Sequence, residues 1–204
     1  MSTTHPARRT PVQGRSQETV QKVLATTAAL LARGLAVETL TTATVAAEAH
    51  VSIGALYRFF PDKQAIVDAI ALRHMETFQE ALASRMMLAF PPDAPAFLGA
   101  IVDAFVDYLA ANPDFRTIAF GAGGRSISGR TRDAYAASGG VSDMVRSVLS
   151  EVFGLEVDAA FELRLRLAIE AGERLLAYAF DQEAPDRAGI LAETRRILAA
   201  TLFG

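Results

Sequence analysis

The sequence from Thr41 to Lys63, TTATVAAEAHVSIGALYRFFPDK, predicts two short helices around a tight turn. Threonine and serine are favoured N-caps, so the first helix is expected to begin at the Thr41-Thr42 pair and the second after Ser52. Pro61 ends the second helix, because proline interrupts helical hydrogen bonding. A helix of this length is not stable alone, so it must pack on its neighbour.

The second helix has one face for packing and others for contact. Leu56 and Phe60 are four residues apart and share the face that packs on the first helix, at Val45 and Ala46. Gly54 removes side-chain bulk near the start of the second helix, which allows close approach to the major groove of DNA. The outward positions are Ile53, Ala55, Tyr57 and Arg58. We therefore expect this segment to bind double-stranded DNA.

The same segment resembles the helix-turn-helix of the tetracycline-repressor (TetR) family of transcriptional regulators, and the resemblance covers residues 20–63. The matching positions are Thr41, Val45-Ala46, Ala49, Val51-Ser52, Gly54-Ala55-Leu56-Tyr57, Phe59-Phe60 and Lys63. His50 replaces the turn glycine of the family, a position that often needs a left-handed backbone, which histidine tolerates better than branched residues do. Phe59 replaces the His or Tyr that is frequent there.

The resemblance implies a set of DNA-contacting residues: Thr41, Thr42, Ser52, Ile53, Gly54, Ala55, Tyr57, Arg58 and Lys63. The threonines, Tyr57 and Lys63 are expected to hold phosphates, because helix N-termini also present free amides to anions. Ile53 and Ala55 are expected to touch bases, with a preference for thymine methyl groups. Arg58 either reads guanine or holds a phosphate.

Charge is distributed unevenly along the 204 residues. Residues 1–63 contain seven of the 20 Lys and Arg and four of the 23 Asp and Glu, so this part is +3 and the remainder is −6. Positive charge favours the end that binds DNA. We expect residues 1–15 to form a disordered basic arm, in which Arg8, Arg9 and Arg15 either reach a minor groove or have no role.

Other classes of protein receive little support from the sequence. The chain has no cysteine, no signal-peptide pattern and no uninterrupted apolar run of membrane-spanning length, so we expect a soluble cytoplasmic protein that does not enter a membrane. His5, His50 and His74 are too scattered for a metal site, and His74 is interpreted as a helix-surface residue. The loop from Gly124 to Thr131 lacks the lysine of a phosphate-binding loop. No enzyme activity and no cofactor are predicted.

Apolar periodicity indicates an all-α fold, with a helix-turn-helix domain at 16–62 and a helical effector-binding and dimerisation domain at 63–204. The helices are expected at 17–33, from 63 to a point before Phe90, at 94–111, through 115–120, from after Arg130 through Tyr135, at 141–153, at 157–180 and at 185–203.

The last two predicted helices carry stripes of small and apolar residues that suit a four-helix bundle between two copies of the chain. The stripes are Leu165, Ala168, Gly172 and Leu176, and Ile190, Leu191, Thr194, Leu198 and Leu202, with Phe161 at the start of the first. Packing within one chain would give the same pattern. We favour a homodimer, because two heads on one duplex specify two half-sites.

Aromatic and flexible apolar residues in the middle helices are numerous enough to line a small-molecule pocket. The predicted pocket residues are Phe78, Leu82, Met86, Phe97, Ile101, Phe105, Tyr108, Phe115, Arg116, Phe120 and Phe161, with Tyr108 or Arg116 as polar anchors. Ordinary core packing is the alternative for each of them. The ligand, unknown in identity, is expected to be apolar or amphipathic.

These features together predict a ligand-responsive transcriptional regulator, a repressor, that binds a palindromic operator as a homodimer and is released by an effector. The effector would favour a position of the long helix from Lys63 that moves the two heads away from half-site spacing. The alternative is a dimeric small-molecule-binding or scaffold protein without specific DNA binding.

Overall fold

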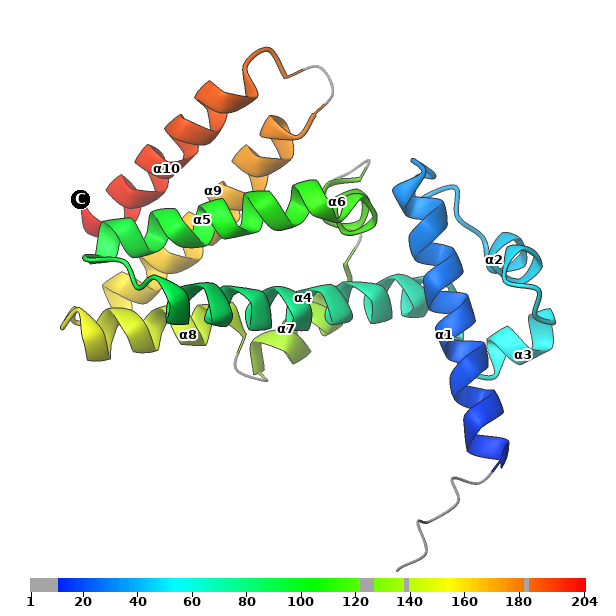
Figure 1. The fold of residues 1–204 in the computed structure, drawn as a ribbon. Coiled ribbons are helices and arrows are strands. Elements are labelled where there is room, and N and C mark those ends of the chain that lie inside the picture. Colours follow the sequence, from blue (N-terminus) through cyan, green and yellow to red (C-terminus); the bar gives the residue numbers. More distant parts are fainter. Residues whose placement is uncertain (1–10, 122–126, 138–139, 182–183) are drawn as a thin grey trace, which may run out of the picture.

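In the computed structural model, which describes residues 11–121, 127–137, 140–181 and 184–204, the described chain is helical without strands (Figure 1). The elements are α1 (Pro11–Ala32), α2 (Thr42–Glu48), α3 (Ile53–Tyr57), α4 (Lys63–Leu88), α5 (Ala94–Ala111), α6 (Pro113–Phe120), α7 (Gly129–Ala137), α8 (Val141–Ser147), the π-helical turn η1 (Val148–Val152), α9 (Ala159–Ala179) and α10 (Arg187–Phe203). The all-α class is confirmed.

Helices α1, α2 and α3 form a small head at one end of the molecule, and α4 runs from this head into the larger helical part (Figure 1). The side chains of Thr41 and Ser52 accept hydrogen bonds from the backbone N–H of Thr44 and Ala55, so both predicted caps are confirmed. Asp62 caps α4 in the same way. The residues that form the buried core of the head include Val23, Leu31, Leu40, Val45, Leu56 and Ile66.

Helix α1 begins at Pro11, so the expected disordered arm does not extend to residue 15 in the structure. Proline is favourable at the first position of a helix, where the missing N–H would have had no helical partner. The side chain of Arg15 is not among those described, and Arg8 and Arg9 lie outside the described residues.

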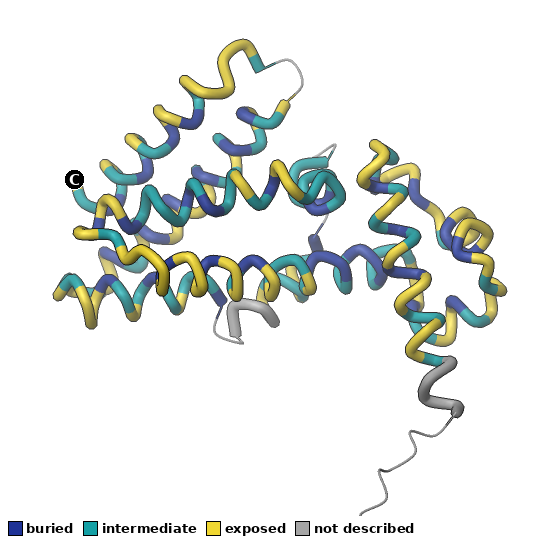
Figure 2. Tube along the Cα trace, in the orientation of Figure 1, coloured by how far each residue is buried: buried dark blue, intermediate teal, exposed yellow. Residues whose placement is uncertain are grey.

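The larger part is built from α4, α5 and α8 to α10, whose buried residues lie on the sides that face one another (Figure 2). Phe97, Leu82, Leu149, Phe161 and Leu198 are members of its core. In the described part of the chain, α5 is the one helix with the length and mean hydropathy (1.5) of a membrane span. Its two aspartates form ion pairs with α10 and α4, and the helix packs against α4, α6 and α10.

Polar contacts connect the head with α4 and α6, and α4 with the start of α7. The hydroxyl of Thr117 in α6 shares its hydrogen between the carbonyl oxygens of Pro113 in the same helix, at 3.0 Å, and of Leu31 in α1, at 3.3 Å. Asp68 of α4 accepts hydrogen bonds from the backbone N–H (3.0 Å) and the hydroxyl (2.5 Å) of Ser128, the residue before α7. Ser128 belongs to the loop 124–131, of which residues 124–126 lie outside the described residues. The head is therefore linked to the rest of the molecule through both α4 and α6, and α7 is tied to α4.

Candidate nucleic-acid interface and effector pocket

Helix α3 has one buried side and one exposed side, as its sequence predicts. Leu56 is fully buried and Phe60, just after the helix, is 6% exposed, and both belong to the core of the head with Val45. Ile53 and Tyr57, four residues apart on one side of the helix, are 44% and 51% exposed. The free side of α3 therefore has the shape and chemistry of a contact surface.

A hydrogen bond joins the exposed side of α3 to the start of α2. The hydroxyl groups of Tyr57 and Thr42 are 3.0 Å apart, although the residues are fifteen positions apart in the sequence. Gly54 is exposed, and a Cβ atom at this position would meet nothing within 4 Å. The space in front of α3 is open, so a backbone or phosphate can approach it closely.

The structure places the two cations predicted to contact DNA in different surroundings. Arg58 is exposed, with its guanidinium 5.7 Å from the centre of the Phe59 ring. The ammonium of Lys63 donates hydrogen bonds to the backbone carbonyl oxygens of Val37 and Glu38, at 3.1 and 2.8 Å. Only the third N–H of Lys63 is left for a phosphate, because the other two hold the loop between α1 and α2.

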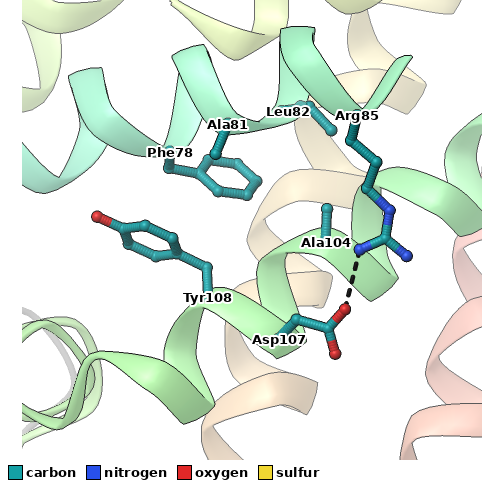
Figure 3. A pocket seen from close by; sticks show the side chains of 7 residues that line it. All are labelled: Phe78, Ala81, Leu82, Arg85, Ala104, Asp107 and Tyr108. Carbon is teal, nitrogen blue, oxygen red and sulfur yellow. Dashed lines mark hydrogen bonds and ion pairs between the residues drawn. The ribbon is translucent and has the colours of Figure 1, made fainter. Parts of the chain in front are cut away.

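A cavity of about 270 Å³ lies between α4 and α5, in the larger part of the molecule (Figure 3). It is lined by Phe78, Ala81, Leu82 and Arg85 of α4 and by Ala104, Asp107 and Tyr108 of α5. Arg85 donates a hydrogen bond to Asp107 at 2.9 Å across one end of the cavity (Figure 3). Three residues of the predicted pocket, Phe78, Leu82 and Tyr108, are present here.

The other predicted pocket residues lie elsewhere. Met86, Phe97, Phe115 and Phe161 are buried in the two cores, Ile101 and Phe105 pack against them, and Arg116 and Phe120 contact the ring of Phe180. Large aromatic side chains at helical spacing filled the core, as the alternative interpretation held. Ala81 and Ala104, which carry no recognisable sequence signal, and the Arg85–Asp107 pair were not predicted.

His74 of α4 is not a surface residue, contrary to the sequence interpretation. Its Nδ1 is 2.8 Å from the hydroxyl of Tyr108 in α5, and its Nε2 is 2.9 Å from a carboxylate oxygen of Asp114 in α6. The ring stacks on Phe115, and the side chain is 15% exposed. Burial and the negative charge of Asp114 raise the pKa of Tyr108, so its phenol stays protonated at neutral pH. The three side chains join α4, α5 and α6.

The stripes predicted to form a dimer interface instead pack α9 on α10 within the chain. Leu165, Ala168, Gly172, Leu176, Leu191, Thr194, Leu198 and Leu202 are all buried, and Ile190 is partly buried. A Cβ atom on Gly172 would lie 3.4 Å from a methyl group of Leu198, which shows how closely the helices approach. The large apolar residues that α9 leaves exposed are different ones: Leu163, Leu167, Ile169 and Tyr178.

Two family models match most of this chain. Residues 23–70 match the family described as bacterial regulatory proteins, tetR family, and residues 92–204 match the family described as tetracyclin repressor-like, C-terminal domain. The chain belongs to the tetR family. It is a transcriptional regulator of this family, with a DNA-binding head formed by α1 to α3. No curated protein matches the sequence.

Solved structures of other regulators share the architecture. A TetR-family transcriptional regulator from Streptomyces coelicolor is 27% identical, with a TM-score of 0.69 over 92% of this chain and 97% of that one. The fatty acid degradation regulator FadR from Bacillus halodurans (13% identical, TM-score 0.66, 90% of this chain and 98% of that one) has the same fold. A TetR transcriptional regulator from Rhodococcus sp. RHA1 also shares the fold, with 16% identity and a TM-score of 0.66 over 93% of this chain and 98% of that one.

The turn of this tetR-family head is formed at the position where the sequence departs from the family pattern. His50 has φ of +52°, the one positive value at a described residue other than glycine. The N–H groups of His50 and Val51 donate to the carbonyl oxygens of Ala47 and Ala46, at 3.1 and 3.0 Å. This is the pair of bonds that closes a helix when the residue after its cap is left-handed. The predicted left-handed conformation of His50 is confirmed.

Proposed function

We propose that this tetR-family regulator is a repressor that binds a palindromic operator as a homodimer and is released by a small effector bound between α4 and α5. The observation that carries the proposal is the exposed side of α3, where Ile53 and Tyr57 face solvent beside an open glycine. We expect the protein to act in the cytoplasm and without a cofactor.

The contacts with DNA follow from the chemistry of this exposed side. The hydroxyls of Tyr57 in α3 and Thr42 at the start of α2 share one hydrogen bond, so the hydroxyl that accepts it keeps its own hydrogen to donate to a phosphate oxygen. Ile53 and Ala55 offer methyl groups, which suit the C5-methyl of thymine. Arg58 adds a charge that a phosphate or a guanine can accept. Phosphate contacts set the position of the head, and Ile53, Ala55 and Arg58 would set the sequence preference.

The exposed apolar residues of α9 support a two-fold dimer. At about 100° per residue, Leu163, Leu167 and Tyr178 fall within about 60° of one another around the helix. Leu163 and Leu167 are 59% and 53% exposed. The same row holds the exposed Glu170 and Arg174, so its apolar part is Leu163 and Leu167. Exposed apolar side chains mark an association surface, and a second copy covers it by the same residues in a two-fold arrangement. This row replaces the predicted interface that the structure buries within the chain.

The route from the pocket to the head supports release by an effector. Helix α4 contributes Ile66 to the core of the head and Phe78 to the pocket wall. Tyr108 lines the pocket and is hydrogen-bonded to His74, which in turn binds Asp114 of α6, and α6 contacts α1. A ligand that binds better to one arrangement of α4 and α5 would therefore also favour one orientation of the head.

A binding titration tests the DNA-binding part of this proposal. A duplex selected from random sequence is labelled, and its fluorescence anisotropy is followed against protein at several salt concentrations, while light scattering gives the mass in solution. We expect a dimer, a preference for two-fold symmetric sequences and a logarithmic affinity that falls by about 0.9 per phosphate contacted for each unit of log salt. A monomer, or binding that selects no sequence, would reject the operator-binding dimer and favour a ligand-binding or scaffold protein.

A further inference from the structure

The pocket between α4 and α5 has an apolar wall and two polar ends, and the two ends differ in their free hydrogen-bonding capacity (Figure 3). At one end the hydroxyl of Tyr108 is engaged by His74. At the other end a single hydrogen bond joins Arg85 to Asp107, between Nη1 and Oδ2. A guanidinium has five N–H donors, so most of those on Arg85 remain available.

We infer that this pocket takes a small amphipathic carboxylate. The ligand carboxylate bonds the guanidinium of Arg85 in place of Asp107, and an apolar tail lies between α4 and α5 against Ala81 and Tyr108, over the buried Phe78, Leu82 and Ala104. The assignment of this ligand as the effector rests on the function proposed above, whereas the binding site itself does not depend on it.

Arg85 favours an anionic ligand because Asp107, its present partner, occupies only one of its N–H donors. A carboxylate and a guanidinium pair best through two parallel hydrogen bonds, and Asp107 makes only one. The carboxylate of Asp107 is 70% exposed, so it can turn into water at little cost when a ligand replaces it. A cationic ligand would instead have to pair with Asp107 and displace Arg85. Arg85 is 48% exposed and its stem forms part of the pocket wall, so displacing it would also remove that part of the wall.

The size of the pocket limits the tail. A volume of about 270 Å³, at about 30 Å³ for each non-hydrogen atom, holds about nine such atoms. The accessible part of the wall is Ala81 and the ring of Tyr108, with Phe78, Leu82 and Ala104 buried behind them; it is suitable for methylene groups but provides no further polar partner. Heptanoate is therefore a suitable probe, and heptan-1-ol and heptylammonium are its neutral and cationic counterparts.

Binding of the three probes to the full-length protein tests the inference, by NMR titration of the ligand signals at pH 7 and constant salt. We expect heptanoate to bind more tightly than heptan-1-ol or heptylammonium. Arg85→Gln should weaken heptanoate binding about tenfold. Asp107→Asn should strengthen it about threefold, because a competitor for Arg85 is removed. Neither variant should change the binding of heptan-1-ol, and Arg130→Gln, which replaces an exposed arginine of α7, should change none of the three.

Three results would overturn the inference: heptanoate binding that Arg85→Gln leaves unchanged, a preference for heptylammonium that Asp107→Asn abolishes, or no binding of any probe to the folded wild-type protein. Operator affinity measured on the same samples separates this inference from the proposed function. If heptanoate binds through Arg85 and operator affinity does not change, the site stands and the effector role fails. If operator binding fails without ligand, the DNA-binding proposal fails and the site is unaffected.

Discussion

Removing the hydroxyl of Tyr57 is the sharpest test of the proposed DNA-reading side of α3. The side chain is 51% exposed and the hydroxyl is bonded to Thr42, so Tyr57→Phe should change the free energy of unfolding by about 0.5 kcal/mol or less. In a dimer on its operator the change removes one hydrogen bond to a phosphate in each half-site. At about 1 kcal/mol each, the loss is about 2 kcal/mol, or about 30-fold in affinity.

The salt dependence of binding distinguishes this contact from a cationic one. A hydroxyl releases no counterion, so Tyr57→Phe should lower affinity at every salt concentration without changing the slope of log affinity against log salt. Arg58→Gln, if Arg58 holds a phosphate, should reduce the slope by about 1.8 for the dimer. Ser84→Ala, which removes an exposed hydroxyl of α4, is the control. An unchanged affinity for Tyr57→Phe, measured by fluorescence anisotropy, would remove Tyr57 from the interface.

Further predictions concern the dimer, the turn and the tie between α4 and α7. Leu167→Arg should weaken dimerisation at least about a hundredfold, because two buried leucines are lost at about 1.5 kcal/mol each; light scattering that still shows a dimer would contradict this. His50→Gly should raise Tm by about 1–2 °C, since glycine adopts positive φ without strain; a lower Tm in calorimetry would refute it. Burial would raise the pKa of Asp68, but hydrogen bonds from Ser128 and its neighbours outweigh burial and lower it. This stabilisation is present above the unfolded pKa of about 3.8 and is lost as pH falls through the lower folded value. Asp68→Asn should therefore cost about 1 kcal/mol at pH 7, and denaturant titrations should show the difference shrinking below pH 3.8; a difference independent of pH would exclude the charge.

The head could be predicted in detail because its structure depends on local chemistry. The caps at Thr41 and Ser52, the pair Leu56 and Phe60 at a spacing of four, and the left-handed residue at His50 each follow from residues close in sequence. The hydrogen bond between Tyr57 and Thr42 was not predictable, because it depends on how α2 and α3 cross.

The larger part was predicted less well because its packing depends on distant partners. A stripe of small and apolar residues shows that a helix side is buried, but not against which helix, and the stripe through Gly172 packs on Leu198 of the same chain. The pocket is lined partly by alanines, which carry no signal. His74 gave no sign of its role, because its partners Tyr108 and Asp114 lie 34 and 40 residues further along the chain.

The position of His74 gives the proposed coupling a simple geometry. His74 lies midway along α4 between Lys63, which holds the loop of the head, and Arg85, which closes the pocket. At 1.5 Å per residue both lie about 16 Å from His74. If the hydrogen bonds of His74 to Tyr108 and Asp114 fix this point, α4 acts as a lever with equal arms. A lateral shift of Arg85 on ligand binding would then appear with similar size and opposite direction at Lys63. Because packed cores change between discrete arrangements and do not deform continuously, a shift of this kind would alter the separation of two heads rather than be absorbed within the helix. We therefore expect loss of the His74 contacts to reduce the ratio of operator affinity without ligand to operator affinity with ligand. Operator affinity alone and ligand affinity alone should fall less. Equal reductions of the ratio, the operator affinity and the ligand affinity would argue against a pivot.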